Sequence, residues 1–207
     1  MTVFMNKRNA LQKIAYCAIL TSATSLFVAC QPNSPSFTAI DITGADYARD
    51  FALTDHNGQA RTLKDFQGKV VMMFFGYTQC PDVCPTSMVE MAEIRKLLGK
   101  DGERVQGLFV TLDPERDKPA MLKEYMANFD PTFLALYATA EKTAALAKDY
   151  KVYFKKVDGP TPTSYTMDHT AGSYVYDTNG KLRLFTRYGT KPELTVEDIR
   201  QLLRQAS

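Results

Sequence analysis

Cys80 and Cys84 have the clearest capacity for chemistry, because they stand close together at the end of a long apolar run. The surrounding sequence, KVVMMFFGYTQCPDVCPTS at 69–87, predicts a strand buried on both faces at 70–75, then a loop and a helix with Pro85 in its first turn. Residues four apart share one face of a helical turn, with Cβ atoms roughly 5–6 Å apart. The two sulfurs can therefore bind one metal ion or close a disulfide.

The spacing of the two cysteines leaves three uses open. Exposed N–H groups at the start of a helix favour negative charge, so thiols placed there lose their protons readily, and thiolates both bind soft metals and attack disulfides. Redox motifs commonly have two residues between the cysteines, whereas Cys80 and Cys84 have three, which suits a pair of metal ligands at least as well. A structural pair or a stabilising disulfide is the remaining interpretation.

The elements that position the cysteines alternate between strands and helices, which predicts an α/β sandwich with a mixed sheet flanked by helices. An Asn-Gly pair at 57–58 indicates an N-terminal β-hairpin across residues 51–63, with His56 as an exposed turn residue. The strands predicted after the central one cover 105–112, 133–137, 152–157, 173–176 and 181–188, and the helices predicted after the cysteine helix cover 119–129, 140–150 and 195–203. This order is typical of a thioredoxin-like domain.

His169 is the third residue with a candidate role. In thioredoxin-like domains the loop before the last hairpin comes over the start of the cysteine-bearing helix and usually carries a cis-proline. Here a loop at 159–164 is predicted to lead to Asp168 and His169, and no proline lies between Met167 and Tyr188. A histidine opposite two thiols is predicted to be a metal ligand, since imidazole and thiolate both bind transition metals. Asp168 either orients the imidazole or faces the solvent.

The composition describes one domain with a substantial core, since the chain has 207 residues and is 45% hydrophobic. The 25 Lys and Arg residues are nearly balanced by 23 Asp and Glu residues, so nothing favours a nucleic-acid partner. Lys7, Arg8 and Lys13 are the only charged residues before Cys30, and an apolar stretch follows at 14–28. This start is typical of an export signal and is short for a transmembrane helix.

The end of this segment, Phe27-Val28-Ala29-Cys30, resembles the bacterial lipoprotein cleavage box, in which the cysteine is diacylated and becomes the new N-terminus. The resemblance implies a signal peptide at 1–29, a lipidated tether at 30–46 and a folded domain at 47–207, anchored to a membrane on the periplasmic side. An uncleaved anchor is the alternative. In that oxidising compartment Cys80 and Cys84 are expected to form a disulfide unless a reductant or a metal holds them otherwise.

Three segments, FFGYTQCPDVCPTS, TLDPERD and DHTAGSYVYD, together resemble the Sco/SenC proteins, copper-binding assembly factors of cytochrome c oxidase with a thioredoxin-like fold and a membrane anchor. The resemblance runs from about residue 50 to the C-terminus and implies that Cys80, Cys84 and His169 bind copper. It also implies delivery of copper to the CuA centre of oxidase subunit II, reduction of that centre's cysteines, or both, with other copper chaperones or thiol reductants as further partners. Many relatives keep an N-terminal transmembrane helix instead of a lipid.

The donor set agrees with this resemblance independently. Two thiolates and one imidazole suit Cu(I) in a roughly trigonal site, whereas Cu(II) would seek a further nitrogen or oxygen ligand. Zinc prefers four ligands, and no fourth can be identified. The loop from Asp113 to Asp117 is expected near the site, where it docks a partner, tunes the metal or caps a helix. Asp82, between the cysteines, is open to the same interpretations.

The main alternative is a metal-free thiol-disulfide oxidoreductase or redox sensor that acts through Cys80 and Cys84. His169 favours a metallochaperone over an enzyme, because a reductase would be expected to keep proline in that loop. A peroxidase is disfavoured because the chain has no Trp and lacks the single-cysteine peroxiredoxin pattern. A surface lipoprotein with a structural disulfide would leave the histidine unexplained.

The apolar residues around the site are expected to pack and shield. Phe75 and Tyr77 are predicted to flank the cysteines, and most methionines are predicted to fill the core. The cysteine helix is predicted to present an apolar face made of Met88, Met91, Ile94, Leu97 and Leu98.

Overall fold

The computed structural model describes residues 36–161 and 164–205. The strands are β1 (Ile40–Asp41), β2 (Ala52–Asp55), β3 (Ala60–Thr62), β4 (Val70–Gly76), β5 (Val105–Thr111), β6 (Leu134–Tyr137), β7 (Phe154–Asp158), β8 (Tyr165–His169), β9 (Gly172–Tyr176) and β10 (Leu182–Arg187). The helices are α2 (Val83–Leu97), α3 (Pro119–Ala127), α4 (Ala140–Asp149) and α5 (Pro192–Arg204), with short 3-10 segments η1 (Leu63–Phe66) and η2 (Gly99–Arg104).

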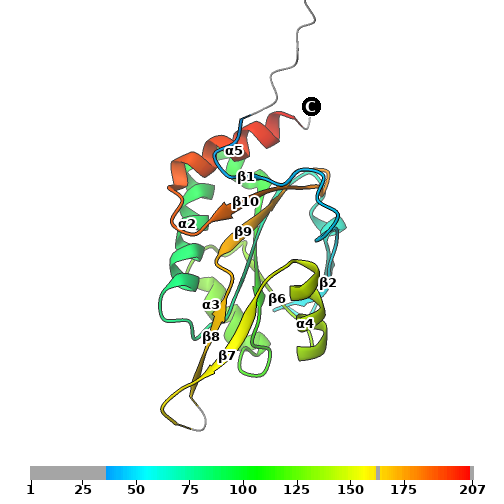
Figure 1. The fold of residues 1–207 in the computed structure, drawn as a ribbon. Helices are drawn as coiled ribbons and strands as arrows, with labels where there is room; N and C mark the ends of the chain where they lie inside the picture. Colours follow the sequence, from blue (N-terminus) through cyan, green and yellow to red (C-terminus); the bar gives the residue numbers. More distant parts are fainter. Residues whose placement is uncertain (1–35, 162–163, 206–207) are drawn as a thin grey trace, which may run out of the picture. The chain divides into compact units, whose positions relative to one another are not determined.

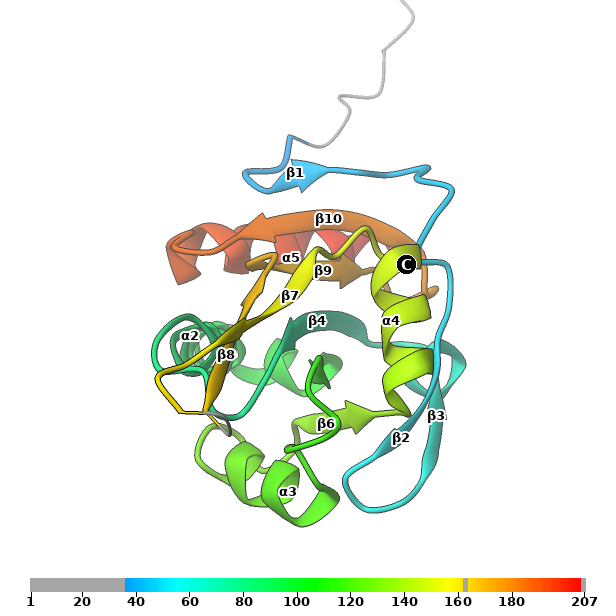
Figure 2. The ribbon, with the colours of Figure 1, turned by 60° about the horizontal axis from the view of Figure 1, so that its bottom comes forward.

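Eight strands form one mixed sheet in the order β1-β10-β9-β4-β5-β6-β2-β3. The central strands β4, β5 and β6 run parallel, whereas β9 pairs with β4 in the antiparallel direction. Helices α2, α3 and α5 cover one face of this sheet and α4 covers the other (Figures 1 and 2). The predicted α/β sandwich is confirmed, and the predicted hairpin of β2 and β3 forms one edge of the sheet, with Gly58 at its turn in the left-handed region (φ +83°).

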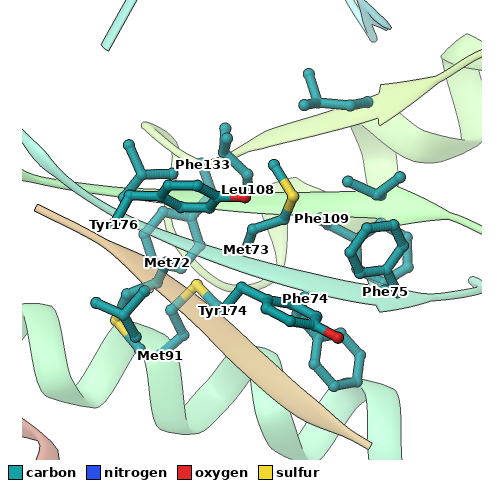
Figure 3. Packing of buried hydrophobic residues seen from close by; sticks show 14 of the residues in the cluster. Met72, Met73, Phe74, Phe75, Met91, Leu108, Phe109, Phe133, Tyr174 and Tyr176 are labelled. Carbon is teal, nitrogen blue, oxygen red and sulfur yellow. The ribbon is translucent and has the colours of Figure 1, made fainter. Parts of the chain in front are cut away.

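The core is built around β4, all seven residues of which are buried. Because successive side chains of a strand point to opposite faces, Met72 approaches Met91 of α2 while Met73 points towards Tyr176 on the other side of the sheet (Figure 3). This double burial explains why the sequence of β4 is continuously apolar instead of alternating. The carboxyl end of the strand is thereby fixed, and the cysteines follow it directly.

Two strands were not predicted. The residues between the loop predicted at 159–164 and His169, for which no strand was predicted, form β8, which pairs only with β7 in a separate two-stranded sheet. The short strand β1 lies within the stretch expected to be a tether, and it pairs with β10. Backbone N–H groups of Thr38 and Ala39 donate to the buried Asp198 carboxylate of α5 at 2.9 and 2.8 Å. Part of the predicted tether is therefore attached to the domain, because a distant side chain holds this segment.

The helices differ from the predictions in two details. Met88, Met91, Ile94 and Leu98 of the predicted apolar face are buried, but Leu97 is 42% exposed, so that part of the prediction is wrong. The last helix begins at Pro192, three residues earlier than predicted, because a proline in the first turn needs no hydrogen-bond partner. Among the described residues, no helix combines the length and apolar character required to cross a bilayer.

Removing side-chain volume from β4 tests this account of the core. We expect Met73→Ala to lower the free energy of unfolding by about 2–5 kcal/mol, because Met73 is fully buried and its loss leaves a cavity. Val89→Ala is the matched control: Val89 is 55% exposed on α2, and its replacement is expected to change stability by no more than about 0.5 kcal/mol. Denaturant unfolding of the reduced, metal-free protein measures the free energy of unfolding of both variants. An equal loss of stability in Met73→Ala and Val89→Ala would contradict the assignment of β4 as the centre of the core.

Candidate metal centre

The two cysteines follow β4 on either side of the start of α2. Cys84 lies in the first helical turn, but Cys80 precedes the helix, so the prediction that both share a helical turn is wrong. A turn closed by the N–H of Cys80 and the carbonyl of Tyr77 (3.3 Å) folds Cys80 back, and the N–H of Cys84 lies 3.4 Å from the Cys80 sulfur. The sulfurs still meet, and both thiols are free rather than joined in a disulfide.

Gly76 lets the buried sulfur lie against the end of β4. A Cβ atom at this position would stand 2.9 Å from Sγ of Cys84 and equally close to the ring of Phe74. Carbon and sulfur cannot approach so closely without a shift, so the absence of a side chain is required here. The glycine in the sequence GYTQC is therefore part of the site.

Asp117 fixes the loop that carries Cys80. Its carboxylate accepts hydrogen bonds from the N–H and Oγ1 of Thr78, at 3.0 and 2.6 Å, and from Oγ1 of Thr111 at 2.6 Å. Asp117 is only 1% exposed, and this burial raises the pKa of its carboxyl group although the three hydrogen bonds oppose the shift. Thr78 stands two residues before Cys80, so these hydrogen bonds to the buried Asp117 restrain the loop that carries Cys80.

Strand β8 brings His169 to the sulfurs. Nε2 lies 3.4 Å from Sγ of Cys84, and Nδ1 lies 3.0 Å from the carbonyl oxygen of Thr170. A carbonyl can only accept, so Nδ1 carries the proton and Nε2 keeps its lone pair, directed at the thiol. This is the tautomer that a metal ligand requires at Nε2.

Aromatic rings enclose the imidazole. The rings of Tyr77 and Phe74 each lie 6.0 Å from it, centroid to centroid, in edge-to-face arrangements. The prediction for Tyr77 is confirmed, but that for Phe75 is wrong, because Phe75 points to the other face of the sheet and packs on Tyr150 and Tyr174. The alternation of side chains along β4 decides which phenylalanine can reach the site.

One donor atom from each of Cys80, Cys84 and His169 lies within 4.8 Å of the others. The structure thus brings together the three residues that the sequence singled out. Cys84 is fully buried, whereas Cys80 and His169 are partly accessible. The cluster is consequently closed on the core side and open towards the solvent, an arrangement that lets a ligand or partner reach two of the three donors.

The two thiols have opposite acidities. A hydrogen bond with the thiol of Cys84 lowers the pKa of Cys80 to about 3, helped by the backbone N–H groups of Asp82 and Cys84, although burial of the Cys80 sulfur opposes the shift. The charged Cys80 sulfur and burial raise the pKa of Cys84 well above its usual range. Cys80 is the nucleophilic thiolate of the pair and Cys84 keeps its proton, as expected when one of two adjacent thiols ionises first.

The acidic residues proposed around the site have different positions. Asp168 is exposed on the outer face of β8, so the carbonyl of Thr170, and not this carboxylate, orients the imidazole. Asp82 is exposed at the cap position of α2. Asp113 is 3% exposed and pairs with Arg116 and with the hydroxyl of Tyr165. Arg116 and Tyr165 were not singled out from the sequence, although Arg116 stands within the TLDPERD segment.

The other candidate ligands are structural in this fold. His56 lies at the β2–β3 turn as predicted, but it is half-buried and not exposed: its Nδ1 accepts from the N–H of Ala135 at 3.1 Å, and burial lowers its pKa. Met72, Met73, Met88 and Met91 are buried, as predicted, and Met167 joins the same hydrophobic cluster from β8.

Comparison with known proteins points to one family. The sequence model of the SCO1/SenC family matches residues 41–204. An SCO2-like protein of Rickettsia felis is 37% identical over 133 residues, which cover 64% of this chain and 65% of that protein. This chain thus spans slightly less than two thirds of that relative's length.

Solved structures give the same result. The structure of Bradyrhizobium japonicum ScoI with copper bound is 42% identical and has a TM-score of 0.68, covering 74% of this chain and 97% of that one. A SCO1/SenC family lipoprotein from Bacillus anthracis is 28% identical with a TM-score of 0.64, covering 76% and 94%. Both likenesses extend over nearly the whole of the solved chain.

The split acidity of the thiols predicts selective labelling. Iodoacetamide is expected to modify Cys80 at a rate that hardly changes between about pH 5 and pH 8, whereas a free cysteine titrates at about 8.5. Cys84 is expected to remain unlabelled because it is buried and protonated. Peptide mass spectrometry of the reduced, metal-free protein measures both rates.

In Cys84→Ala the Cys80 thiolate loses its main hydrogen-bond donor, so the labelling rate of Cys80 should become pH-dependent. A labelling rate that already rises steadily with pH in the wild type would contradict the assignment of Cys80 as a thiolate.

Proposed function

This chain belongs to the SCO1/SenC family, and from that premise we propose that it is a copper chaperone that serves the assembly of the CuA centre of cytochrome c oxidase. In this proposal Cys80, Cys84 and His169 hold copper as cargo, and oxidase subunit II receives it. The observation that carries the proposal is the meeting of two sulfurs and one imidazole nitrogen within 4.8 Å at the carboxyl end of β4. The copper-bound B. japonicum relative supports the choice of metal.

The donor set fits Cu(I) better than zinc. Thiolates are soft ligands that favour Cu(I), and three donors suffice for it. A structural zinc site would be closed by a fourth ligand, but the cluster found among the described residues has three members. The carbonyl of Thr170 occupies Nδ1 of His169 and leaves Nε2 as the nitrogen that faces the metal, Cys80 already holds its charge, and Cys84 must release its proton when the metal binds.

The unequal burial of the donors suits transfer rather than storage. Cys84 is fixed in the core, whereas Cys80 and His169 are reachable from the solvent. An incoming ligand of a partner can replace the accessible donors one at a time, while the buried sulfur retains the ion until exchange is complete. Asp82, exposed beside Cys80, is placed where a docking partner would contact it.

The same pair supports a second function, the reduction of the partner's disulfide. The Cys80 thiolate would attack one sulfur of that disulfide and form a mixed disulfide, releasing the other as a thiolate. Cys84, once deprotonated, would then attack Cys80 and release the second thiol, leaving a Cys80–Cys84 disulfide. The partner is reduced by two electrons and this chain is oxidised by two, so an external thiol reductant must restore it. The low pKa of Cys80 and the buried position of Cys84 favour these roles.

The N-terminal segment completes the proposal. Removal of a signal peptide at 1–29 and lipidation of Cys30, both outside the described residues, would anchor the protein to a membrane on the periplasmic side, where oxidase copper centres are assembled. The family lipoprotein from B. anthracis supports this mode of attachment. The tether predicted at 30–46 includes β1, which pairs with β10 of the domain.

Titration with Cu(I) tests the proposed function. With Cys17 and Cys30 replaced by serine, the reduced chain is expected to bind one Cu(I) in competition with a Cu(I) chelator. We expect His169→Ala to weaken binding by more than about tenfold, since even residues that only orient a metal ligand contribute about 10–100-fold. Replacing Cys80 or Cys84 with serine should be more severe, because a thiolate is lost.

His56→Ala is the matched control, because His56 is the only other histidine and lies at a turn of β2 and β3. Its Cu(I) affinity should equal that of the wild type. If the wild type reduces a disulfide substrate but shows no Cu(I) binding, the chaperone proposal fails and the reductase proposal stands.

A further inference from the structure

The ribbon that carries His169 lacks support from the main sheet. Strands β7 and β8 pair only with each other and extend away from the eight-stranded sheet (Figure 1). Four of the five residues of β7 are exposed. Two-stranded ribbons are at best marginally stable in water on their own. The position of His169 next to the sulfurs therefore depends on contacts that β8 makes with the domain.

Only one face of β8 makes such contacts. Tyr165, Met167 and His169 alternate with the exposed Thr166 and Asp168, so the first three share the inward face. Met167 is buried in the core cluster at the middle of the strand. His169 occupies one end of the strand and Tyr165 the other, so whatever holds Tyr165 also sets the direction in which the strand presents His169.

Arg116 joins Tyr165 to the cysteine loop. Its guanidinium pairs with the Asp113 carboxylate, and Nη1 donates both to the carbonyl oxygen of Tyr165 at 2.9 Å and to Oε1 of Gln79 at 3.1 Å. Gln79 immediately precedes Cys80. One side chain thus links three segments: the loop after β5, the loop carrying Cys80, and the strand carrying His169.

The side chain of Tyr165 closes the same network. Its hydroxyl donates to the Asp113 carboxylate at 2.8 Å, and the guanidinium carbon of Arg116 lies 3.4 Å from the centroid of its ring. The ammonium of Lys156, on β7, also lies over this ring at 3.9 Å. Such cation–π contacts strengthen when they are removed from water. Asp113 is 3% exposed, so its charge requires both partners.

We infer that Arg116 is a positioning residue, which together with Asp113 and Tyr165 clamps β8 to the cysteine loop and holds His169 against the two sulfurs. The inference rests on the proposed function, because it explains how the third copper donor is kept in place. The guanidinium is required for its shape, since it donates in several fixed directions in one plane and stacks on an aromatic ring. A lysine could pair with Asp113 but could not make the other contacts together.

A double-mutant cycle on Cu(I) affinity tests the clamp. Arg116→Met, which keeps the aliphatic bulk, is expected to weaken Cu(I) binding by about tenfold, the lower end of the range for residues that orient a metal ligand. In the His169→Ala background the same substitution should have no further effect, because the clamp acts through a residue that is gone. Independent losses that multiply in the double variant would overturn the inference.

Conservative variants separate positioning from folding. Arg116→Lys retains the charge beside Asp113 and is expected to bind Cu(I) nearly as weakly as Arg116→Met. Tyr165→Phe keeps the ring but loses the hydroxyl, so its affinity for Cu(I) should lie between that of these two variants and that of the wild type. Arg187→Met, at an exposed arginine at the end of β10, is the control and should match the wild type. Full rescue by lysine would overturn the role assigned to the guanidinium.

Hydrogen exchange of the reduced, metal-free chain distinguishes this inference from the proposed function. Arg116→Met is expected to accelerate amide exchange in β7 and β8 by at least about tenfold while exchange in β4 and β9 stays unchanged, because only the ribbon depends on the clamp. This result stands whether or not the chain binds copper. Unchanged exchange in the ribbon overturns the clamp even if Cu(I) binds as proposed, and acceleration throughout the sheet would show a general loss of stability and overturn it as well.

Discussion

The contact between Nε2 of His169 and the sulfur of Cys84 joins segments 85 residues apart in the chain, and the rest of the site depends on it. The cysteine side is fixed by the buried strand β4, by Gly76, which leaves room for the sulfur, and by Asp117, which holds the loop of Cys80. The histidine side is fixed by the carbonyl of Thr170, which sets the tautomer, and by β8. The cysteines are thus held by the packed core, whereas His169 is carried by a two-stranded ribbon and depends on the contacts that this ribbon makes with the domain.

The three donors also differ in burial, and this difference has a chemical consequence. Cys84 is buried and protonated, whereas the Cys80 thiolate and the imidazole are partly accessible. Metal binding therefore releases the proton of the buried Cys84 thiol, whereas Cys80 is already a thiolate. The same division of roles serves thiol exchange, in which an accessible thiolate attacks and a buried thiol resolves. Copper transfer and disulfide reduction thus require the same geometry, and the redox state of the pair decides which one can occur.

The sequence was sufficient for the elements whose signal is local. The continuous apolar run of β4, the Asn-Gly turn of the first hairpin and the proline in the first turn of α3 each carry their own pattern. The site residues could be chosen because two cysteines and one histidine are rare and chemically distinctive. Of the two strands that were missed, β1 depends on partners far away in the chain, β10 and Asp198. Strand β8 pairs with the neighbouring β7 across a short loop, and the backbone carbonyl of Thr170 that orients the imidazole has no sequence signature. The prediction for Phe75 is wrong because the face of β4 that meets the imidazole carries Phe74, and the sequence alone does not show which face this is.

X-ray absorption spectroscopy of the Cu(I)-loaded, reduced chain tests the central claim most directly, because it counts the atoms bound to the metal and identifies them as sulfur or nitrogen. The account predicts two sulfur ligands and one imidazole nitrogen in the wild type, with the imidazole contribution lost in His169→Ala and retained in His56→Ala. A Cu(I) ion bound by sulfur alone in the wild type, or an imidazole signal that survives in His169→Ala, would contradict the convergence of these three residues on copper.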